Sequence, residues 1–259
     1  MKNNLYITSG IFGGLGNQLF QVATTIATGL KYKMNYIFTR KPIENRSHYW
    51  DTLFRKIKTV DMLDTSSYQI HQENDHKYEE IKQPTNNLLL HGYFQTSKYF
   101  SEYSDKIREL IVLTDSEQFV VKTYIQKLRD TYPNKKLVGI HVRRTDYIKL
   151  SWELPLDYYI RAMNMFDKEN TVFVCISDDM KWCVDNLPNI VPCEQHIDYL
   201  DMFIYSNLDS YIISNSTFSW WGVFFGNADK NKRVIAPKEP WIRTCNTNPY
   251  IYEPDWEKI

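Results

Sequence analysis

The chain has 259 residues, and its 31 basic and 31 acidic side chains give a formal net charge of zero and a pI near 7.0. This balance argues against a broad nucleic-acid interface, which needs a basic face, but it allows a local basic pocket. The length suits one large domain or two small ones. The first residues lack the apolar core of a signal peptide and no apolar run is long enough to span a membrane, so we expect a cytoplasmic protein.

Short apolar runs alternate with segments of helical periodicity along the chain, which indicates an α/β fold. In the first half we expect strands at 5–11, 36–39 and 88–94, and helices at 19–30 and 50–57. In the second half we expect helices at 116–129, 154–166, 178–187, 197–204 and 218–228, and strands at 137–142, 171–177, 210–216 and 233–237. This order predicts two Rossmann-like domains, 1–120 and 121–259, with the boundary between Thr114 and Lys136.

The four cysteines do not form a recognisable framework. They are Cys175, Cys183, Cys193 and Cys245, and their spacing has no paired metal-binding pattern. Cys175 lies in an apolar run, where a cysteine usually acts as a small buried hydrophobic residue. A chain of this length does not need disulfides to build a core, so we expect no disulfide framework.

A glycine-rich turn, GGLGNQ (Gly13–Gln18), joins the first predicted strand to the first helix. Such turns bring backbone amides and a helix N-terminus close to a polar ligand. The spacing differs from GxGxxG, and no acidic residue stands where it would bind a ribose, so an NAD-dependent dehydrogenase is a poor match. The alternative is a tight turn in which Asn17 caps the helix.

The segment HVRRTDY (His141–Tyr147) follows an apolar strand and carries two adjacent arginines. On a strand, His141 and Arg143 point to one face and Arg144 to the other. A guanidinium group binds phosphate through two parallel hydrogen bonds and keeps its charge, which suits an anion at the end of a strand. The alternative is a structural salt bridge between an arginine and Asp146. Because one acid does not balance two arginines, we expect the remaining charge to bind a diphosphate.

Two further strand ends carry polar side chains. SNSTFSWW (Ser214–Trp221) places hydroxyl groups where a strand meets a helix, and hydroxyls together with helix N-terminal amides form an anion site. CISDD (Cys175–Asp179) ends in two carboxylates, which can accept hydrogen bonds from a guanine ring at the ligand-binding edge of an α/β sheet. Both segments have a simpler interpretation as helix caps, through Ser216 or Thr217 in the first and Asp178 in the second.

Four blocks of the chain resemble α-1,2-fucosyltransferases, a family that includes bacterial enzymes and the animal blood-group H transferases. The blocks are GGLGNQLFQVA, HGYFQTSKYF, HVRRTDY and SNSTFSWWG, and they occur in the family's order over positions 13–222. The resemblance implies a GT-B-like fold in which two Rossmann-like domains face a cleft, with the acceptor side in 1–120 and the donor site in 121–259. It also implies GDP-β-L-fucose as the donor, inversion at the anomeric carbon, no metal or other cofactor, and a galactose-terminated glycan as the acceptor.

The resemblance assigns roles to individual residues. Arg143 and Arg144 would hold the donor phosphates, and His141 would lie against the nucleotide. Asp178, with Asp179 as the alternative, would bind guanine. The remaining donor-site residues match the hydroxyl-rich loop and the first glycine turn: Asn215, Ser216, Thr217, Ser219, Gly14, Gly16 and Asn17.

Catalysis is assigned to few residues. Arg143 would stabilise the charge that develops on the leaving phosphate, which would remove the need for Mg²⁺. Asn17 would face the fucose and the acceptor. An inverting transfer is helped by a carboxylate or imidazole near the acceptor hydroxyl, and the candidates are Asp146 and Glu153.

Three other functions stay open. The same fold could form another linkage such as α-1,3, could use another GDP-deoxyhexose, or could bind glycans without turnover. The retained Arg143, Arg144 and Asn17 argue against the last, because a lectin does not need a diphosphate pocket. We expect no membrane anchor, as in bacterial rather than Golgi members, and we expect a cytoplasmic enzyme that could also work at the periphery of a membrane where glycans are assembled. The polar segment 41–87 would supply most of the acceptor-specific surface, and no nucleic-acid partner is expected.

Overall fold

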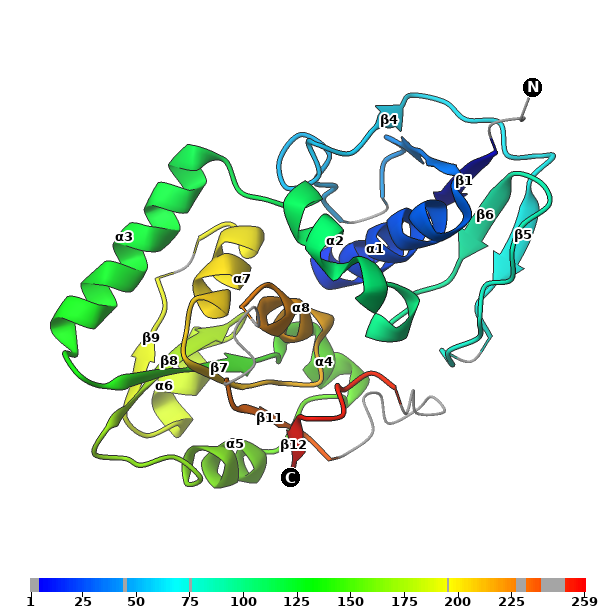
Figure 1. Cartoon of the computed structure of the whole chain (residues 1–259). Coiled ribbons are helices and arrows are strands. Elements are labelled where there is room, and N and C mark those ends of the chain that lie inside the picture. The colour runs from blue at the N-terminus through cyan, green and yellow to red at the C-terminus, as the bar shows by residue number, and fades with distance from the viewer. Residues whose placement is uncertain (1–4, 44–45, 75, 195, 227–231, 239–249) are drawn as a thin grey trace. The chain divides into compact units, whose positions relative to one another are not determined.

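Figure 1 shows the computed structural model of the chain, which describes residues 5–43, 46–74, 76–194, 196–226, 232–238 and 250–259. The chain divides into two compact units: Met1–Leu113 with Asn248–Ile251, and Thr114–Thr247 with Tyr252–Ile259. The second unit begins with helix α3 (Asp115–Thr131), whose start is fixed by a capping box between Thr114 and Glu117. A division drawn at residue 120 would cut this helix, so the boundary between the compact units lies at its cap.

The first unit is built on a parallel four-stranded sheet in the order β2-β1-β6-β5. Its strands are β1 (Tyr6–Ser9), β2 (Asn35–Tyr36), β5 (Gln69–Gln72) and β6 (Leu88–His91), and β3 (Phe38–Thr39) and β4 (Thr59–Val60) pair separately. Its helices are α1 (Leu15–Tyr32), α2 (Ser104–Leu110) and the short 3-10 helices η1 (Ser97–Tyr99) and η2 (Ser101–Tyr103). Since α1 follows β1 after a short turn, that turn lies at the carboxyl edge of the sheet.

Three predicted elements of the first unit differ in the structure, and its β4, β5, α2, η1 and η2 were not predicted. Residues 36–39 form two strands, because β2 pairs with β1 whereas β3 pairs with β4. Residues 50–57 form a series of turns instead of a helix, held by the packing of Trp50 on Phe54, whose ring centroids are 5.3 Å apart. The strand predicted at 88–94 ends at β6, because a Cβ at Gly92 would lie 2.3 Å from the Cβ of Glu73 and the chain turns at this close approach.

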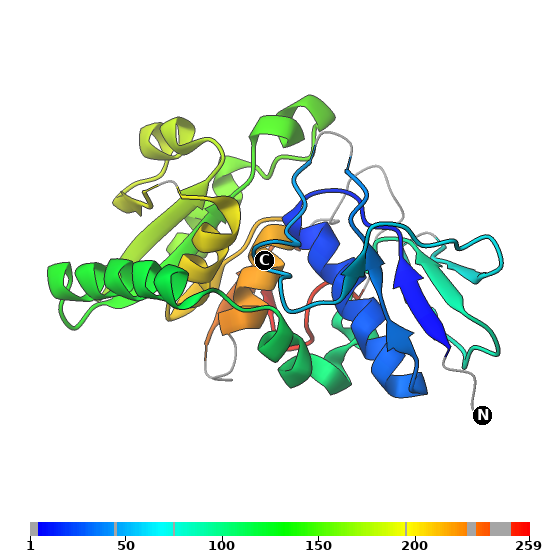
Figure 2. The same ribbon diagram turned by 90° about the horizontal axis from the view of Figure 1, so that it is seen from above.

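The second unit is a parallel six-stranded sheet in the order β12-β11-β10-β7-β8-β9. Its strands are β7 (Lys136–Val142), β8 (Thr171–Ser177), β9 (Ile190–Pro192), β10 (Ser210–Ile212), β11 (Val234–Ala236) and β12 (Glu257–Lys258). Its helices are α3, α4 (Thr145–Leu150), α5 (Leu156–Met163), α6 (Met180–Asn186), α7 (Asp198–Ser206) and α8 (Thr217–Gly226). Figures 1 and 2 show α7 and α8 over one face of this sheet and α5 and α6 over the other, as a parallel sheet requires.

Most predicted elements of the second unit are confirmed, with shifted ends. The helix predicted at 154–166 is shorter and begins at Leu156, because Pro155 is its N-cap and not a residue of its first turn. The sequence prediction missed α4, β9 and β12, which have six, three and two residues and are too short to show a periodic pattern. The last two residues of the helix predicted at 218–228 lie outside the described residues.

A tyrosine ring joins the helical layer to the sheet. The Tyr205 ring of α7 fills the space that side chains would need at two glycines, because a Cβ at Gly139 or Gly222 would lie 2.6 or 2.5 Å from it. Its hydroxyl donates a hydrogen bond to the carbonyl of Ile212 at 3.0 Å. The glycine of SNSTFSWWG therefore lets α8 pack closely on α7.

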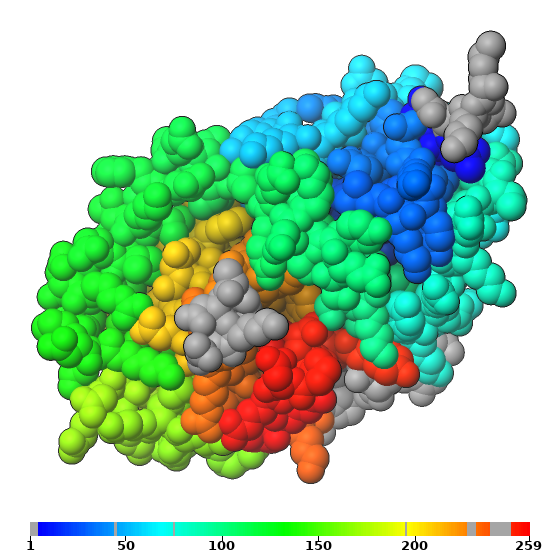
Figure 3. Space-filling view, viewed as in Figure 1, coloured from blue at the N-terminus to red at the C-terminus, as the bar shows by residue number. Residues whose placement is uncertain are grey.

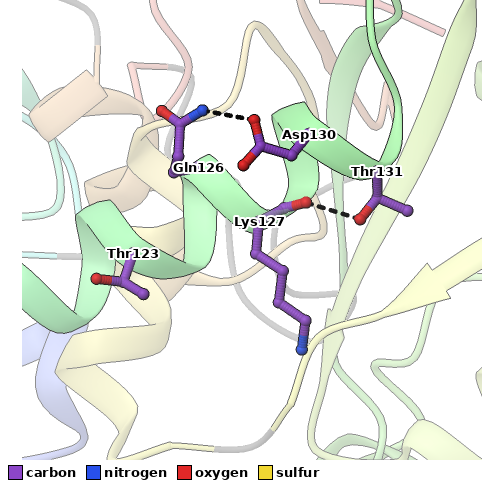
Figure 4. Close-up of a pocket in the computed structure, with 5 residues that line it drawn as sticks. All are labelled: Thr123, Gln126, Lys127, Asp130 and Thr131. Atoms are coloured by element: carbon purple, nitrogen blue, oxygen red, sulfur yellow. Dashed lines mark hydrogen bonds between the residues drawn. The ribbon is translucent and has the colours of Figure 1, made fainter.

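Helix α3 lies at the surface of the second unit, as Figure 3 shows. Phe119 on this helix is 70% exposed. A hollow on α3 is lined by polar side chains, which Figure 4 shows: Thr123, Gln126, Lys127, Asp130 and Thr131. None of the predicted site residues lines this hollow. In the part of the chain that the structure describes, no helix is both long and apolar enough to cross a membrane.

Candidate active site

The carboxyl end of β7 carries the double arginine. Arg143 and Arg144 follow the strand directly, and α4 begins at Thr145. In the parallel sheet β7 lies between β10 and β8, so the segments that follow these three strands share one edge. This edge brings together HVRRTDY, CISDD and SNSTFSWW, as the sequence analysis requires.

Both arginines are held by carboxylates. Arg143 makes a bidentate pair with Asp146, with Nε and one terminal nitrogen at 2.8 and 2.7 Å from the two carboxylate oxygens. Its other terminal nitrogen lies 3.1 Å from Asp178. The Arg144 Nε lies 3.2 Å from Asp179, and its guanidinium carbon lies 3.9 Å from the ring centroid of Trp182. Both guanidinium groups are therefore fixed in position: Arg143 by its bidentate pair with Asp146, and Arg144 by its ion pair with Asp179 and by the face of Trp182.

The predicted unbalanced positive charge beside the two arginines is absent from this arrangement of described residues, so that prediction is wrong. It set one acid, Asp146, against both arginines. The structure adds Asp178 and Asp179 from the end of β8, so two guanidinium groups meet three carboxyl groups. An anion that binds here must therefore compete with a carboxylate for at least one arginine.

The two aspartates at the end of β8 have different partners. Asp179 caps α6, because it accepts a hydrogen bond from the backbone amide of Trp182 at 3.2 Å. The prediction of Asp178 as this cap is wrong. Asp178 instead accepts hydrogen bonds from the Arg144 amide at 2.9 Å and the Thr145 hydroxyl at 2.5 Å. It thus ties the start of α4 to the neighbouring strand, and its carboxylate is already occupied where a guanine-binding role was expected.

His141 is buried and neutral. Its Nδ1 lies 2.8 Å from the Ser214 hydroxyl, and its ring stacks on Phe218 with centroids 4.8 Å apart. Burial, followed by the positive charge of Arg143, lowers the pKa of His141 to about 3. His141 therefore links β7 to the loop after β10 as an uncharged ring.

The loop after β10 is held on both sides. The Tyr147 hydroxyl donates to the carbonyl of Asn215 at 3.1 Å, and burial raises the pKa of this tyrosine to about 12. The Asn215 amide donates to the carbonyl of Trp152 at 2.8 Å. Thr217 is the first residue of α8, and the Phe218 amide lies 3.4 Å from the Ser216 hydroxyl.

Ser219 differs from the other hydroxyls of this loop. Its side chain is fully buried, and its hydroxyl lies within hydrogen-bonding distance of the carbonyls of Ser214 and Ser216, at 3.3 and 3.0 Å. These contacts stabilise the turn into α8. Its geometry favours a structural role over the predicted contact with a donor.

The glycine turn of the first unit presents backbone more than side chains. Gly13 has φ of +81°, and Gly14 is the N-cap of α1 without a side-chain cap. The prediction that Asn17 caps this helix is wrong, since Asn17 lies inside the helix and its Oδ1 accepts a hydrogen bond from Gln95 at 2.9 Å. Gly16 is buried in the first turn of α1. A Cβ at Gly14 would meet no atom within 4 Å, so the space beside the helix start is open.

A buried carboxylate that the sequence prediction missed fixes the HGYF turn. Glu73 follows β5, and its side chain is 3% exposed. Its two oxygens accept hydrogen bonds from the backbone amides of Tyr93 and Phe94 at 2.7 and 2.9 Å. The next residue, Gln95, donates to Asn17. Glu73 therefore positions the partner of Asn17, and nothing in the polar sequence around it distinguishes this glutamate.

The two candidate general bases differ in how they are bound. Both oxygens of Asp146 accept hydrogen bonds from Arg143. Glu153 lies between α4 and α5, and its buried Oε2 has no hydrogen-bond partner among the described residues. Of the two, only Glu153 has a carboxylate oxygen without a hydrogen-bond partner among the described residues, and that oxygen is buried.

In a parallel α/β unit, the segments that follow the carboxyl ends of the strands form the edge where ligands commonly bind, and both arginines lie at this edge. The model of glycosyl transferase family 11 matches residues 7–259, and the chain belongs to this family of glycosyltransferases.

Several curated proteins are similar to the chain. An alpha-1,2-colitosyltransferase from Escherichia coli is 29% identical over 184 residues, which cover 65% of this chain and 61% of the relative. The O-antigen biosynthesis glycosyltransferase WbnK from Escherichia coli is 29% identical over 178 residues, which cover 63% and 58%. The human galactoside alpha-(1,2)-fucosyltransferase 1 is 24% identical over 237 residues, which cover 84% and 64%. The match therefore spans about three fifths of the length of these relatives.

The fold is also found among solved structures. NodZ alpha-1,6-fucosyltransferase co-crystallised with GDP has a TM-score of 0.60 and 13% sequence identity, and the match covers 96% of this chain and 100% of that one. The soaked NodZ structure with GDP-fucose gives a TM-score of 0.58. At this identity the likeness concerns the fold.

Proposed function

We propose that the protein transfers L-fucose from GDP-β-L-fucose to the 2-hydroxyl of a terminal galactose on a glycan, with inversion at the anomeric carbon. The observation that carries this proposal is the pair of fixed guanidinium groups, Arg143 and Arg144, at the carboxyl edge of β7 in a member of glycosyl transferase family 11. The α-1,2 linkage is supported by relatives whose names contain it. In the GT-B-like scheme, the second unit binds the donor and the first unit binds the acceptor.

The chemistry follows from where charge develops. When the bond between the fucosyl carbon and the phosphate oxygen breaks, negative charge grows on the β-phosphate. Donors fixed at that position stabilise the transition state more than the bound substrate, and they lower the barrier. Arginines perform this role without a divalent cation, so we propose that no metal takes part in the chemical step.

The two arginines contribute differently to this proposal. The Nε and one terminal nitrogen of Arg143 are bound to Asp146, so its orientation is set before a ligand arrives. Arg144 uses only its Nε, and its terminal nitrogens have no hydrogen bond within the described part of the chain. Arg144 therefore offers a free edge to a phosphate, whereas Arg143 must exchange its contact with Asp178.

For the acceptor proton, we propose Glu153 over Asp146. The Glu153 Oε2 has no hydrogen-bond partner in the described part of the chain, so it could accept a proton without breaking an ion pair once its buried side chain turns toward the acceptor, while Asp146 would first have to release Arg143. If Glu153 is the base, Glu153→Gln should lower kcat more than Asp146→Asn does. The Asp146 variant should instead raise the KM for the donor, because it frees Arg143. The reverse pattern would assign the base to Asp146.

A second donor is favoured by one comparison. One relative is named as a colitosyltransferase, and colitose is fucose without its 3-hydroxyl. The alternative to fucose is therefore a GDP-deoxyhexose that lacks a hydroxyl at this position.

The test is product analysis after incubation with GDP-fucose or GDP-colitose, a panel of β-galactosides, and EDTA. An α-1,2-fucosylated product formed in EDTA supports the donor, the linkage and the metal-free step together. Faster transfer from GDP-colitose assigns the other sugar, and an α-1,3 product changes the linkage. Activity that is lost in EDTA and restored by Mn²⁺ or Mg²⁺ contradicts the metal-free step. GDP binding without transfer to any acceptor favours a glycan-binding protein, and the absence of GDP binding overturns the proposal.

A further inference from the structure

Three side chains with metal-binding atoms meet beyond the end of β9. Cys193 follows this strand, His196 lies in the connection to α7, and Asp201 lies in the first turns of α7. A thiol sulfur, an imidazole nitrogen and a carboxylate oxygen from these residues all lie within 4.8 Å of one another. The described residues contain no other such group of three. None of the three belongs to the candidate active site.

The surroundings favour a cation. Cys193 is 5% exposed, and the side chains of His196 and Asp201 are 20% and 15% exposed. Two further acidic groups, Asp198 and Glu194, add negative charge near the cluster. The Lys127 ammonium is paired with Glu194 at 3.1 Å and is not part of the three-residue group.

The ligand side chains already contact one another and a tyrosine of α3. His196 Nδ1 lies 3.0 Å from the Asp201 carboxylate. The Tyr124 hydroxyl of α3 lies within hydrogen-bonding reach of the Cys193 thiol, and its ring meets the His196 ring edge-on at 5.7 Å. A bound dication would stabilise the thiolate and the carboxylate at once.

We propose that Cys193, His196 and Asp201 form a zinc site. Mixed sulfur, nitrogen and oxygen donors suit Zn²⁺, whereas Mg²⁺, Mn²⁺ and Ca²⁺ prefer oxygen ligands. Tetrahedral zinc at ordinary bond lengths separates its ligand atoms by about 3.5 Å, so the side chains need to move by about 1 Å from the positions described here. Water or the Tyr124 hydroxyl completes the coordination.

The site has a structural role. Its three ligands lie within nine residues, Cys193 to Asp201, so the ion closes a short connection between the sheet and α7. The same helix carries Tyr205, which packs between Gly139 of β7 and Gly222 of α8. Zinc would therefore stabilise the packing of α7 on the sheet, and it takes no part in the proposed fucosyl transfer.

The test uses the untagged full chain, stripped of metal, and Zn²⁺ alone in competition with a chromophoric chelator. One zinc should bind per chain, and Cys193→Ser, His196→Gln and Asp201→Asn should each weaken its affinity at least tenfold. Matched controls are Cys183→Ser, a buried cysteine outside the cluster, and His48→Gln, an exposed histidine, and both should bind zinc as the unchanged chain does.

Cobalt gives an independent readout. Co²⁺ added to the unchanged chain should give a thiolate charge-transfer band in the near ultraviolet, and this band should be absent in Cys193→Ser. If Cys193→Ser does not fold by circular dichroism, the band in the unchanged chain and its loss in His196→Gln decide the question. No stoichiometric zinc binding by the unchanged chain, or affinity that survives all three substitutions, overturns the site. Neither readout uses transferase activity, so failure of the proposed function leaves the result interpretable.

Discussion

The polar clusters of the two units are built from different kinds of groups. In the second unit, Arg143 and Arg144 are held by carboxylates and stand beside the neutral ring of His141. In the first unit, the uncapped start of α1 and the Asn17–Gln95 amide pair offer neutral donors, with the buried Glu73 behind them. In the charged cluster, Arg143 can accept an anion only by exchanging its contact with Asp178, whereas Arg144 uses only its Nε. The cluster of the first unit carries no charged donor of this kind among the residues named here. Under the proposed function, the charged cluster would bind the nucleotide and the neutral cluster would bind sugar hydroxyls.

The largest effect on turnover should come from removing the guanidinium charge of Arg143 in the second unit. Arg143→Ala should lower kcat by about a hundredfold or more, because it removes a donor aimed at developing charge. The measurement is steady-state kinetics with GDP-fucose, together with circular dichroism to confirm the fold. Arg161→Ala, which changes an exposed arginine on α5, is the control and should keep normal turnover. Near-normal turnover in folded Arg143→Ala contradicts the role assigned to this cluster.

Because folding keeps His141 neutral, the free energy of unfolding should decrease as the pH falls. Its folded pKa of about 3 lies below the ordinary value of about 6.5, so the unfolded chain binds a proton between these values that the folded chain does not. This contribution to stability is present above the ordinary pKa and is lost as pH falls toward 3, by at most about 1.4 kcal/mol per pH unit. Urea unfolding from pH 7 to pH 4 should show that His141→Gln loses less stability than the unchanged chain. Parallel loss in both proteins would mean that His141 titrates normally.

Replacing Asp178 tests whether a carboxylate of the charged cluster stabilises the fold in addition to holding an arginine. Asp178→Ala leaves the Arg144 amide and the Thr145 hydroxyl without this acceptor, and it should cost about 1–3 kcal/mol of unfolding free energy. The control is Asp185→Ala, whose exposed pair with Lys181 should contribute less than about 0.5 kcal/mol. Equal unfolding free energies for the two variants in urea would show that Asp178 serves only a ligand.

Glu73 should give the smallest effect, and its sign is opposite to that of His141. Burial raises the folded pKa of Glu73 above its ordinary value, despite two backbone amide donors. Its stabilising contribution is therefore complete below about pH 4.3 and is lost as pH rises through the folded pKa. The advantage of the unchanged chain over Glu73→Gln should shrink between pH 4 and pH 7 in urea unfolding. Glu102→Gln, at an exposed position, should show no such trend.

The sequence located the charged cluster because its signals are local. A strand pattern that ends in two arginines is visible in the residues themselves, and the structure places them directly after β7. The carboxylate partners of the arginines were harder to predict, because Asp178 and Asp179 follow another strand. They are also adjacent in sequence, and a small rotation of the chain decides which of the two faces which partner. Asp179 therefore became the cap of α6 while Asp178 bound the start of α4.

The first unit was predicted less well, because its key contacts join segments that carry no pattern. Glu73 lies in a polar stretch and is recognised only from the backbone amides that it binds. The segment at 50–57 has apolar residues at helical spacing, but packing of Trp50 on Phe54 stabilises turns instead. The cluster of Cys193, His196 and Asp201 is equally hard to predict, because it contains one cysteine and has no paired cysteine spacing.

The parallel sheet of the second unit also separates two kinds of sequence change. All the polar segments discussed above follow the carboxyl ends of strands, while β7 is entered through a turn at Asn134, whose φ is +62°. The seven residues of β7 put about 20 Å between these two ends. Loops at the entry edge can therefore change in length, accept an attached tag or accumulate substitutions without altering the polar segments at the carboxyl edge.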